Sequence, residues 1–194
     1  MDDTAASALF AWLDRELWLA TACADDKPGG LIASFVSPVS IVPEMPRVMI
    51  AVGHQHFTWQ LIEKSQAFAL HLLGKDNLPW IRRFGLESGH EVDKFASLTW
   101  STSETGSPIL DHTIGWMDCR VEASTSIGDR TVLIGEVIQS RITCYGPPLT
   151  LKQVLEESPS DVHSEMRQQL HQDIVLSGDA IAQWRSEQRE RSTT

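Results

Sequence analysis

Residues 30–58 constrain the fold of this chain more than any other stretch, because three prolines separate two short apolar runs. The runs, residues 31–36 and 48–52, each have the length and composition of a β-strand. Proline has no N–H for a strand ladder, so the residues between the runs form an irregular loop or a sheet edge. The prolines are Pro38, Pro43 and Pro46. The stretch therefore predicts strand, broken loop, strand, and then the start of a helix near Trp59.

Further strand-like runs predict a mainly β fold. Residues 17–23 are expected to pair with residues 31–36 as a hairpin, because a turn rich in Asp, Pro and Gly lies between them. Residues 116–126 and 131–144 are the longest strand candidates, and a Gly-Asp turn joins them. Short strands with local connections, interleaved with short helices, indicate a β-barrel that carries helices.

Helical patterns lie at both ends of the chain. The composition changes after the Gly-Pro-Pro segment at 146–148. We therefore predict a barrel domain with an N-terminal helix, residues 1–146, and a C-terminal helical extension, residues 147–194, which packs on the barrel or on a dimer interface. The last residues, 187–194, are polar and are predicted to fray. The expected helices are 4–15, 59–65, 78–84, 149–156 and 161–185.

Composition excludes several classes of protein. The formal net charge of −10 opposes non-specific nucleic-acid binding. The apolar runs are too short to cross a bilayer, and the acidic N-terminus lacks the pattern of a secretion signal. Three widely spaced cysteines favour neither a disulfide framework nor a zinc site. A cytoplasmic protein without a membrane or nucleic-acid partner and without a metal site is expected.

Polar side chains gather where the second apolar run meets the following helix. His54, Gln55, His56 and Thr58 directly precede or begin that helix, whose free N–H groups and dipole favour an anion such as a phosphate. Serine hydroxyls follow the first run. Two ordinary alternatives stay open: the serines make local hydrogen bonds, and Thr58 serves only as a helix cap.

The order of motifs in this chain resembles that of the flavin reductase-like FMN-binding domains. Ala33-Ser34-Phe35-Val36-Ser37, the prolines and the apolar strand match the family's strand–loop–strand signature. Asp93-Lys94-Phe95 and Gly128-Asp129 follow in the family's order. The resemblance spans residues 16–143.

The resemblance implies a Greek-key-like split β-barrel that binds FMN, rather than FAD or riboflavin, near the interface of a homodimer. It places Ala33, Ser34, Phe35, Val36 and Ser37 along the flavin ring and ribityl chain. It places His54, Gln55, His56, Phe57 and Thr58 around the phosphate. NAD(P)H is the implied co-substrate.

Two further residues, Arg130 and Trp80, could contact the second substrate or the flavin. Many family members carry a His after the Gly-Asp of the last hairpin, where this chain has Arg130. Arg130 could bind the phosphate of a nicotinamide cofactor or an acidic substrate, or it could be a solvated turn residue. Trp80 follows a proline in an irregular segment and could lie over a flavin, although core packing is the usual use of tryptophan.

The resemblance implies an oxidoreductase that passes hydride from NAD(P)H through flavin N5 to a small-molecule acceptor or a partner monooxygenase. No catalytic triad or carboxylate pair is evident, as expected when the cofactor carries the chemistry. The alternative is a non-catalytic FMN- or haem-binding module that acts in sensing or storage.

Overall fold

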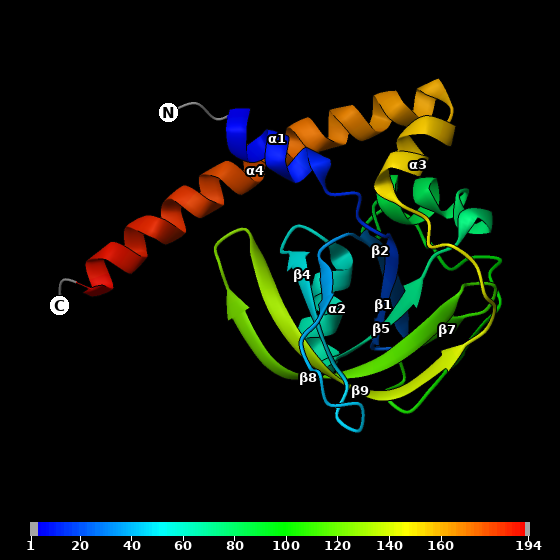
Figure 1. The fold of residues 1–194 in the computed structure, drawn as a ribbon. Helices are drawn as coiled ribbons and strands as arrows, with labels where there is room; N and C mark the ends of the chain where they lie inside the picture. Colours follow the sequence, from blue (N-terminus) through cyan, green and yellow to red (C-terminus); the bar gives the residue numbers. More distant parts are fainter. Residues whose placement is uncertain (1–3, 193–194) are drawn as a thin grey trace.

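The computed structural model describes residues 4–192 and shows a curled antiparallel sheet (Figure 1). The sheet has seven strands, and its curl encloses α2 (Phe57–Ser65). The predicted mainly β, split-barrel fold is confirmed. In spatial order the strands are β2 (Lys27–Ala33), β1 (Trp18–Ala24), β5 (Ala67–Leu72), β8 (Gly115–Ser126), β9 (Arg130–Ile142), β4 (Arg47–Gly53) and β3 (Val36–Pro38).

Both predicted hairpins form, and left-handed residues close them. The β1–β2 turn consists of Asp25 and Asp26, with φ of 51° and 59°. Two consecutive positive φ values twist the turn in the same sense as the strands. Gly128 has φ of 102° in the β8–β9 turn, a conformation that glycine adopts without steric cost.

The core has two parts that meet at β1. The first lies between α2 and the curled sheet, where large side chains such as Ile62 and Phe68 are fully buried. The second lies outside the curl and joins β1 to the π-helical segment η2 (Ile81–Leu86) and to α3 (Leu151–Glu157). Backbone bonds from Leu149 to Leu17 and Leu73 also tie the residues before α3 to the barrel. The predicted division of the chain at residue 146 stays a prediction.

A small second sheet and a buried histidine were not predicted. β6 (Trp100–Thr102) pairs with β7 (Pro108–Leu110), and η1 (Lys75–Asn77) follows β5. His71 on β5 is fully buried between the sheets, with Nδ1 3.1 Å from the carbonyl of Leu19 and Nε2 3.1 Å from the backbone N–H of Leu110. Because Nε2 must accept from an N–H, the proton sits on Nδ1. Burial lowers the pKa of His71 to about 4, so the ring is neutral.

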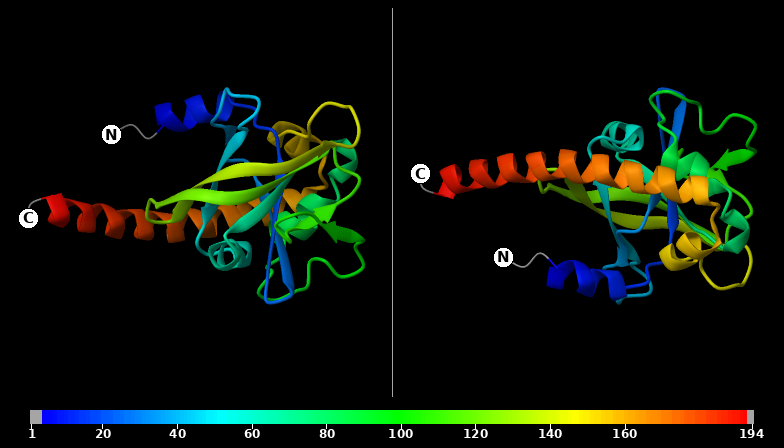
Figure 2. Two further views of the ribbon diagram at one scale, coloured as in Figure 1. Left: turned by 90° about the horizontal axis from the view of Figure 1, so that it is seen from below. Right: turned by 90° about the horizontal axis from the view of Figure 1, so that it is seen from above.

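The first and last helices of the chain extend beyond the barrel. Figure 2 shows α1 (Thr4–Trp12) and α4 (Ser160–Ser192) on opposite sides of the β8–β9 hairpin. Residues 187–194 were predicted to fray, but α4 continues to Ser192. The prediction is therefore wrong for residues 187–192. A Gln183–Glu187 bond one turn apart supports the extra turns. The apolar side chains Leu9, Phe10 and Trp12 of α1 are exposed.

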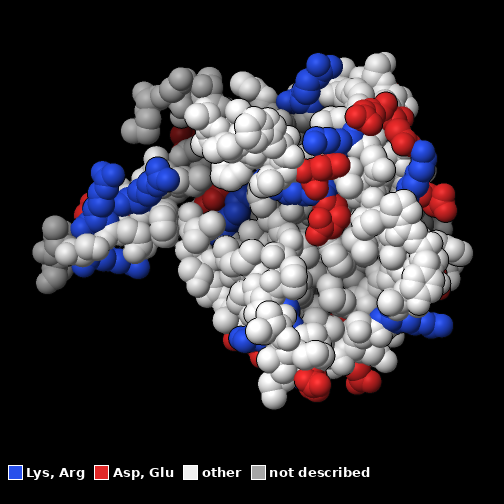
Figure 3. All heavy atoms as spheres, viewed as in Figure 1, with Lys and Arg blue, Asp and Glu red and all other residues white. Residues whose placement is uncertain are grey.

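Charge is distributed unevenly between the barrel and the end of α4. On the face drawn in Figure 3, acidic and basic side chains are interspersed over the barrel, and basic side chains gather on the protruding end of α4. No helix within residues 4–192 combines the length and the apolar character that a membrane span needs.

Candidate functional site

Three adjoining hollows form one cavity at the mouth of the curled sheet. All three are lined by Ile32 and His56, which makes them continuous. The first hollow, about 140 Å³, lies between the N-terminus of α2 and residues 84–89. The second, about 320 Å³, lies along residues 31–35, and the third, about 240 Å³, reaches towards α3. We call the three together the central cavity.

The N-terminus of α2 points unpaired polar groups into the first hollow. His56 has the extended backbone of a cap, but its side chain makes no capping hydrogen bond with any described residue. Thr58 is only 3% exposed, lines the hollow, and its hydroxyl has no hydrogen-bond partner within residues 4–192. A hydroxyl that opens into a hollow and has no partner in the protein can bond a ligand there, so this end of the cavity is suited to a ligand with acceptor oxygens.

Lys94 adds a buried positive charge to the same hollow. Its ammonium donates to the carbonyls of Gly30 and Phe84, each at 3.2 Å, and its third N–H has no partner among the described residues. Burial lowers the pKa of Lys94 to about 8, so the group is still mostly charged at neutral pH. Sequence reasoning noted Lys94 only within the Asp93-Lys94-Phe95 match and did not assign it to the site.

His56 stands at the junction of the three hollows. Burial is the main cause that lowers its pKa, and Lys94 and Arg130 add to the effect, while Asp173 opposes it. The imidazole is therefore neutral near pH 7, with one ring nitrogen available to donate. Phe57 and Gln55, also predicted for the site, line the first hollow beside it.

The second hollow has an apolar wall and a paired arginine. Ala33, Ser34 and Phe35 line it from the end of β2. The Arg130 guanidinium lies 5.1 Å from the ring centroid of Phe35 and contacts Asp129 Oδ2 through Nε (2.7 Å) and Nη2 (2.6 Å). Burial would raise the pKa of Asp129, but the bonds from Arg130 and Ser177 outweigh burial and lower it. Arg130 is thus already neutralised within the protein.

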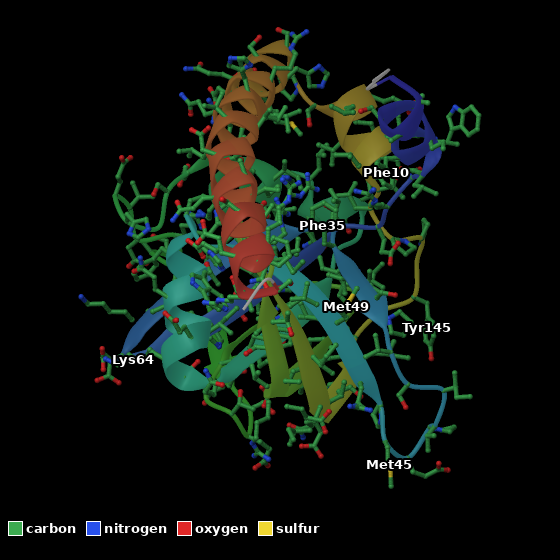
Figure 4. All side chains as sticks on the ribbon, turned by 90° about the vertical axis from the view of Figure 1, so that its left-hand side faces the viewer. Phe10, Phe35, Met45, Met49, Lys64 and Tyr145 are labelled. Atoms are coloured by element: carbon green, nitrogen blue, oxygen red, sulfur yellow. The ribbon has the colours of Figure 1, made fainter. Side chains whose placement is uncertain are left out.

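α4 provides the remaining wall. Gln169, Leu170, Asp173, Ile174 and Ser177 line the hollows from this helix. Figure 4 shows α4 crossing in front of the barrel, with Phe35 beside it. The spacing of one helical turn places these side chains on one face. The sequence pattern predicted the helix but not its position over the cavity.

Four of the predicted site residues lie elsewhere. Val36 and Ser37 line a separate groove of about 410 Å³ beside the proline-rich loop. The His54 ring is 2.9 Å from the Thr131 hydroxyl and packs against Trp59. Trp80 packs edge-on against Phe84 in the second part of the core. In this structure, none of the four lines the central cavity.

Comparison with known families and structures identifies the class of protein. The model of the flavin reductase like domain matches residues 13–153, which is most of the chain. The chain belongs to the flavin reductase like domain family. The resemblance inferred from the motifs is confirmed, and the match ends before α4 begins.

Two individual relatives share 30% and 34% of their residues with this chain over the matched segments. The high molecular weight rubredoxin of Moorella thermoacetica is 30% identical over 136 residues, covering 69% of this chain and 58% of that protein. The flavin-dependent monooxygenase reductase subunit HsaB of Mycobacterium tuberculosis is 34% identical over 113 residues, covering 58% of each chain. The chain therefore spans somewhat over half the length of these two relatives.

Solved structures show the same fold. Nitrilotriacetate monooxygenase component B from Mycobacterium thermoresistibile superposes with a TM-score of 0.65 at 26% identity, covering 73% of this chain and 78% of that one. The curled barrel is thus shared with this solved structure.

Proposed function

We propose that this chain binds FMN in the central cavity and passes hydride equivalents from NAD(P)H to an electron acceptor. One observation carries the proposal: the buried Lys94 ammonium and the unpartnered Thr58 hydroxyl face the same hollow at the N-terminus of α2, in a chain of the flavin reductase like family. These donors suit a phosphate.

The cavity suggests a role for each wall. Lys94, Thr58, His56 and the first backbone N–H groups of α2 would hold the phosphate. Ala33, Ser34 and Phe35 would lie along the ring and ribityl chain. Val36, Ser37, His54 and Trp80 would act through packing, because they line other parts of the molecule.

The chemistry requires little of the protein beyond binding. Bound FMN supplies a ring that accepts and donates hydride, so the chain needs no general base. The neutral His56 can donate one hydrogen bond without adding a charge. The Asp129–Arg130 pair keeps Phe35 in place through the contact of the guanidinium with the ring.

We also propose a homodimer in the cytoplasm that supplies reduced flavin to a small acceptor or a partner monooxygenase. Support comes from the exposed apolar side chains Phe10 and Trp12 on α1, and Ile41 and Met45 on the proline-rich loop. A relative named as the reductase subunit of a monooxygenase supports the partner. Light scattering of the purified chain tests the dimer.

The absorption spectrum of the purified protein, followed by anaerobic titration with NADH and with NADPH, tests the function. A flavin spectrum that bleaches with either nucleotide supports the oxidoreductase. A flavin spectrum that neither nucleotide bleaches would favour the non-catalytic binding module. A colourless protein that takes up neither FMN nor FAD would overturn the flavin site. Titration with FMN, FAD and riboflavin in parallel identifies the preferred flavin.

A further inference from the structure

α4 completes the central cavity although it lies outside the part of the chain that matches the family model. The match ends at residue 153, and the helix runs from Ser160 to Ser192. Its cavity-facing side carries polar residues at Gln169, Asp173 and Ser177, spaced by one turn, with Leu170 and Ile174 beside them. The cavity wall formed by α4 therefore lies outside the residues that match the family model.

The helix is attached to the barrel on both sides of the cavity. On the N-terminal side of the cavity-lining residues of α4, Asp161 and Glu165 pair with Arg82 on η2, the first at 2.9 Å. Beyond the cavity-lining residues, the β8–β9 turn lies so close to α4 that a Cβ on Gly128 would be 2.9 Å from Cβ of Trp184. Between these points Gln55 donates to Asp173 at 3.3 Å. Asp173 is thus held at the cavity.

The charges on the cavity wall are separated along its length. Lys94 and Glu87 bring one positive and one negative charge to the first hollow. Arg130 and Asp129 neutralise each other at the second hollow. Asp173 lines the second and third hollows, and among residues 4–192 its one hydrogen bond comes from the uncharged Gln55. The α4 side of the cavity therefore carries one unneutralised carboxylate.

We propose that Asp173 determines the specificity for the second substrate. Its carboxylate favours uncharged or cationic electron acceptors on the α4 side and disfavours anionic ones. The proposal rests on the flavin site proposed above, with the phosphate at Lys94. A fixed negative charge at the mouth of a cavity lowers the local concentration of anions and raises that of cations.

The test compares two one-electron acceptors of opposite charge. FMN-loaded protein is reduced with dithionite, so that no nicotinamide step enters, and mixed with ferricyanide or with hexaammineruthenium(III). Each acceptor takes one electron, so two equivalents reoxidise the flavin and its protons pass to solvent. In Asp173→Asn the ferricyanide rate should rise and the hexaammineruthenium rate should fall, each by about three- to tenfold at low ionic strength. Added salt should reduce both changes.

Controls separate charge from structure. Asp179→Asn makes the same change on an exposed part of α4 and should leave both rates unchanged. Asp173→Glu should keep the selectivity of the parent chain. The midpoint potential of the bound flavin gives a reading that is independent of any acceptor, and it should rise in Asp173→Asn because a nearby negative charge opposes reduction. A purely structural role would move both acceptor rates in the same direction.

Different experimental results would contradict the role of Asp173 and the flavin site. Rates that move together, or do not move, with an unchanged midpoint potential would overturn the role of Asp173 and leave the flavin site intact. An apoprotein that binds no FMN in a fluorescence titration would overturn both. Asp173 does not line the phosphate-binding hollow, although its charge reaches His56 there, so the dissociation constant for FMN should change by less than about twofold in Asp173→Asn.

Discussion

The barrel and α4 both line the central cavity, but different forces hold them in place. On the barrel side, Lys94 and Thr58 are 7% and 3% exposed and line the cavity next to the two parts of the core. On the α4 side, Leu170 and Ile174 are 60% and 59% exposed, and exposed ion pairs and single hydrogen bonds make much of the attachment. A packed core contributes far more free energy than exposed ion pairs.

Mutations on the two sides of the cavity should therefore affect different properties of the protein, its stability on the barrel side and its substrate specificity on the α4 side. Changes on the barrel side alter the free energy of unfolding and the affinity for the cofactor together, because the same side chains serve both. Changes on α4 can alter what enters the cavity while the fold stays intact. The following predictions test this contrast, beginning with the largest expected effect.

The largest effect is expected from His71→Ala on the barrel side. The change opens a cavity and leaves the Leu19 carbonyl and the Leu110 N–H without their partner. We expect the free energy of unfolding to fall by about 3–5 kcal/mol, measured by urea denaturation. His171→Ala on the exposed surface of α4 is the matched control and should cost little. Equal losses in the two variants would contradict the contrast.

His71 also makes stability depend on pH. Its pKa is about 4 in the folded state and about 6.5 when unfolded, so the unfolded chain takes up a proton first as the pH falls. The contribution of His71 is full above pH about 6.5 and declines towards pH 4, by up to about 3 kcal/mol. Urea denaturation of the parent chain and His71→Gln across this range measures it. A loss of the same size in both proteins would show that His71 is not the cause.

Lys94→Met tests the cofactor side of the barrel wall. The change keeps the length of the side chain and removes the charge. FMN affinity should fall by about 10- to 100-fold, because a charge-assisted bond to phosphate is lost. Riboflavin affinity, measured by the same fluorescence titration, should change little because riboflavin has no phosphate. Lys64→Met, at an exposed lysine on α2, is the control. A parallel loss for riboflavin would place Lys94 away from the phosphate.

A smaller effect is expected when Lys94 loses its proton. The pKa of Lys94 is about 8 in the free protein, so the ammonium is charged below this pH and neutral above it. FMN affinity should therefore weaken as the pH rises from about 7 to about 9.5, towards the value of Lys94→Met. The affinity of Lys94→Met itself should be flat across this range. An equal slope in both proteins would assign the pH dependence to another group.

The smallest effect is expected at the attachment of α4. Arg82→Gln removes two ion pairs whose side chains are exposed on both partners. Exposed pairs contribute little, so the thermal unfolding midpoint should stay close to that of the parent chain. Differential scanning calorimetry measures it, with Arg83→Gln on the same segment as the control. A decrease as large as that of His71→Ala would show that α4 is part of the cooperative core.

The sequence predicted most of the sheet because strand signals are local. The long hairpin at 116–126 and 131–144 corresponds to Gly115–Ser126 and Arg130–Ile142 in the structure. β7 escaped prediction because it has three residues and depends on the bond between Leu110 and His71, which are 39 positions apart. Such a contact leaves no local pattern in the sequence.

The candidate site was predicted in part. Ala33–Phe35 and Gln55–Thr58 meet at one cavity, but the neighbouring Val36, Ser37 and His54 do not. β2 ends at Ala33 and β3 begins at Val36, so the chain turns away between them. Lys94 reaches the cavity from a loop, and nothing in its local sequence shows that Gly30 and Phe84 hold it there.

The amino-acid sequence was sufficient to predict the family, most of the strands, the broken proline loop and a polar helix start. These features depend on local patterns and on the order of motifs along the chain. The folded chain was needed to show that a buried lysine shares the hollow with Thr58, that Arg130 is neutralised by Asp129, and that α4 brings Asp173 to the cavity wall. These facts depend on contacts between distant residues, where burial and charge pairing control the chemistry.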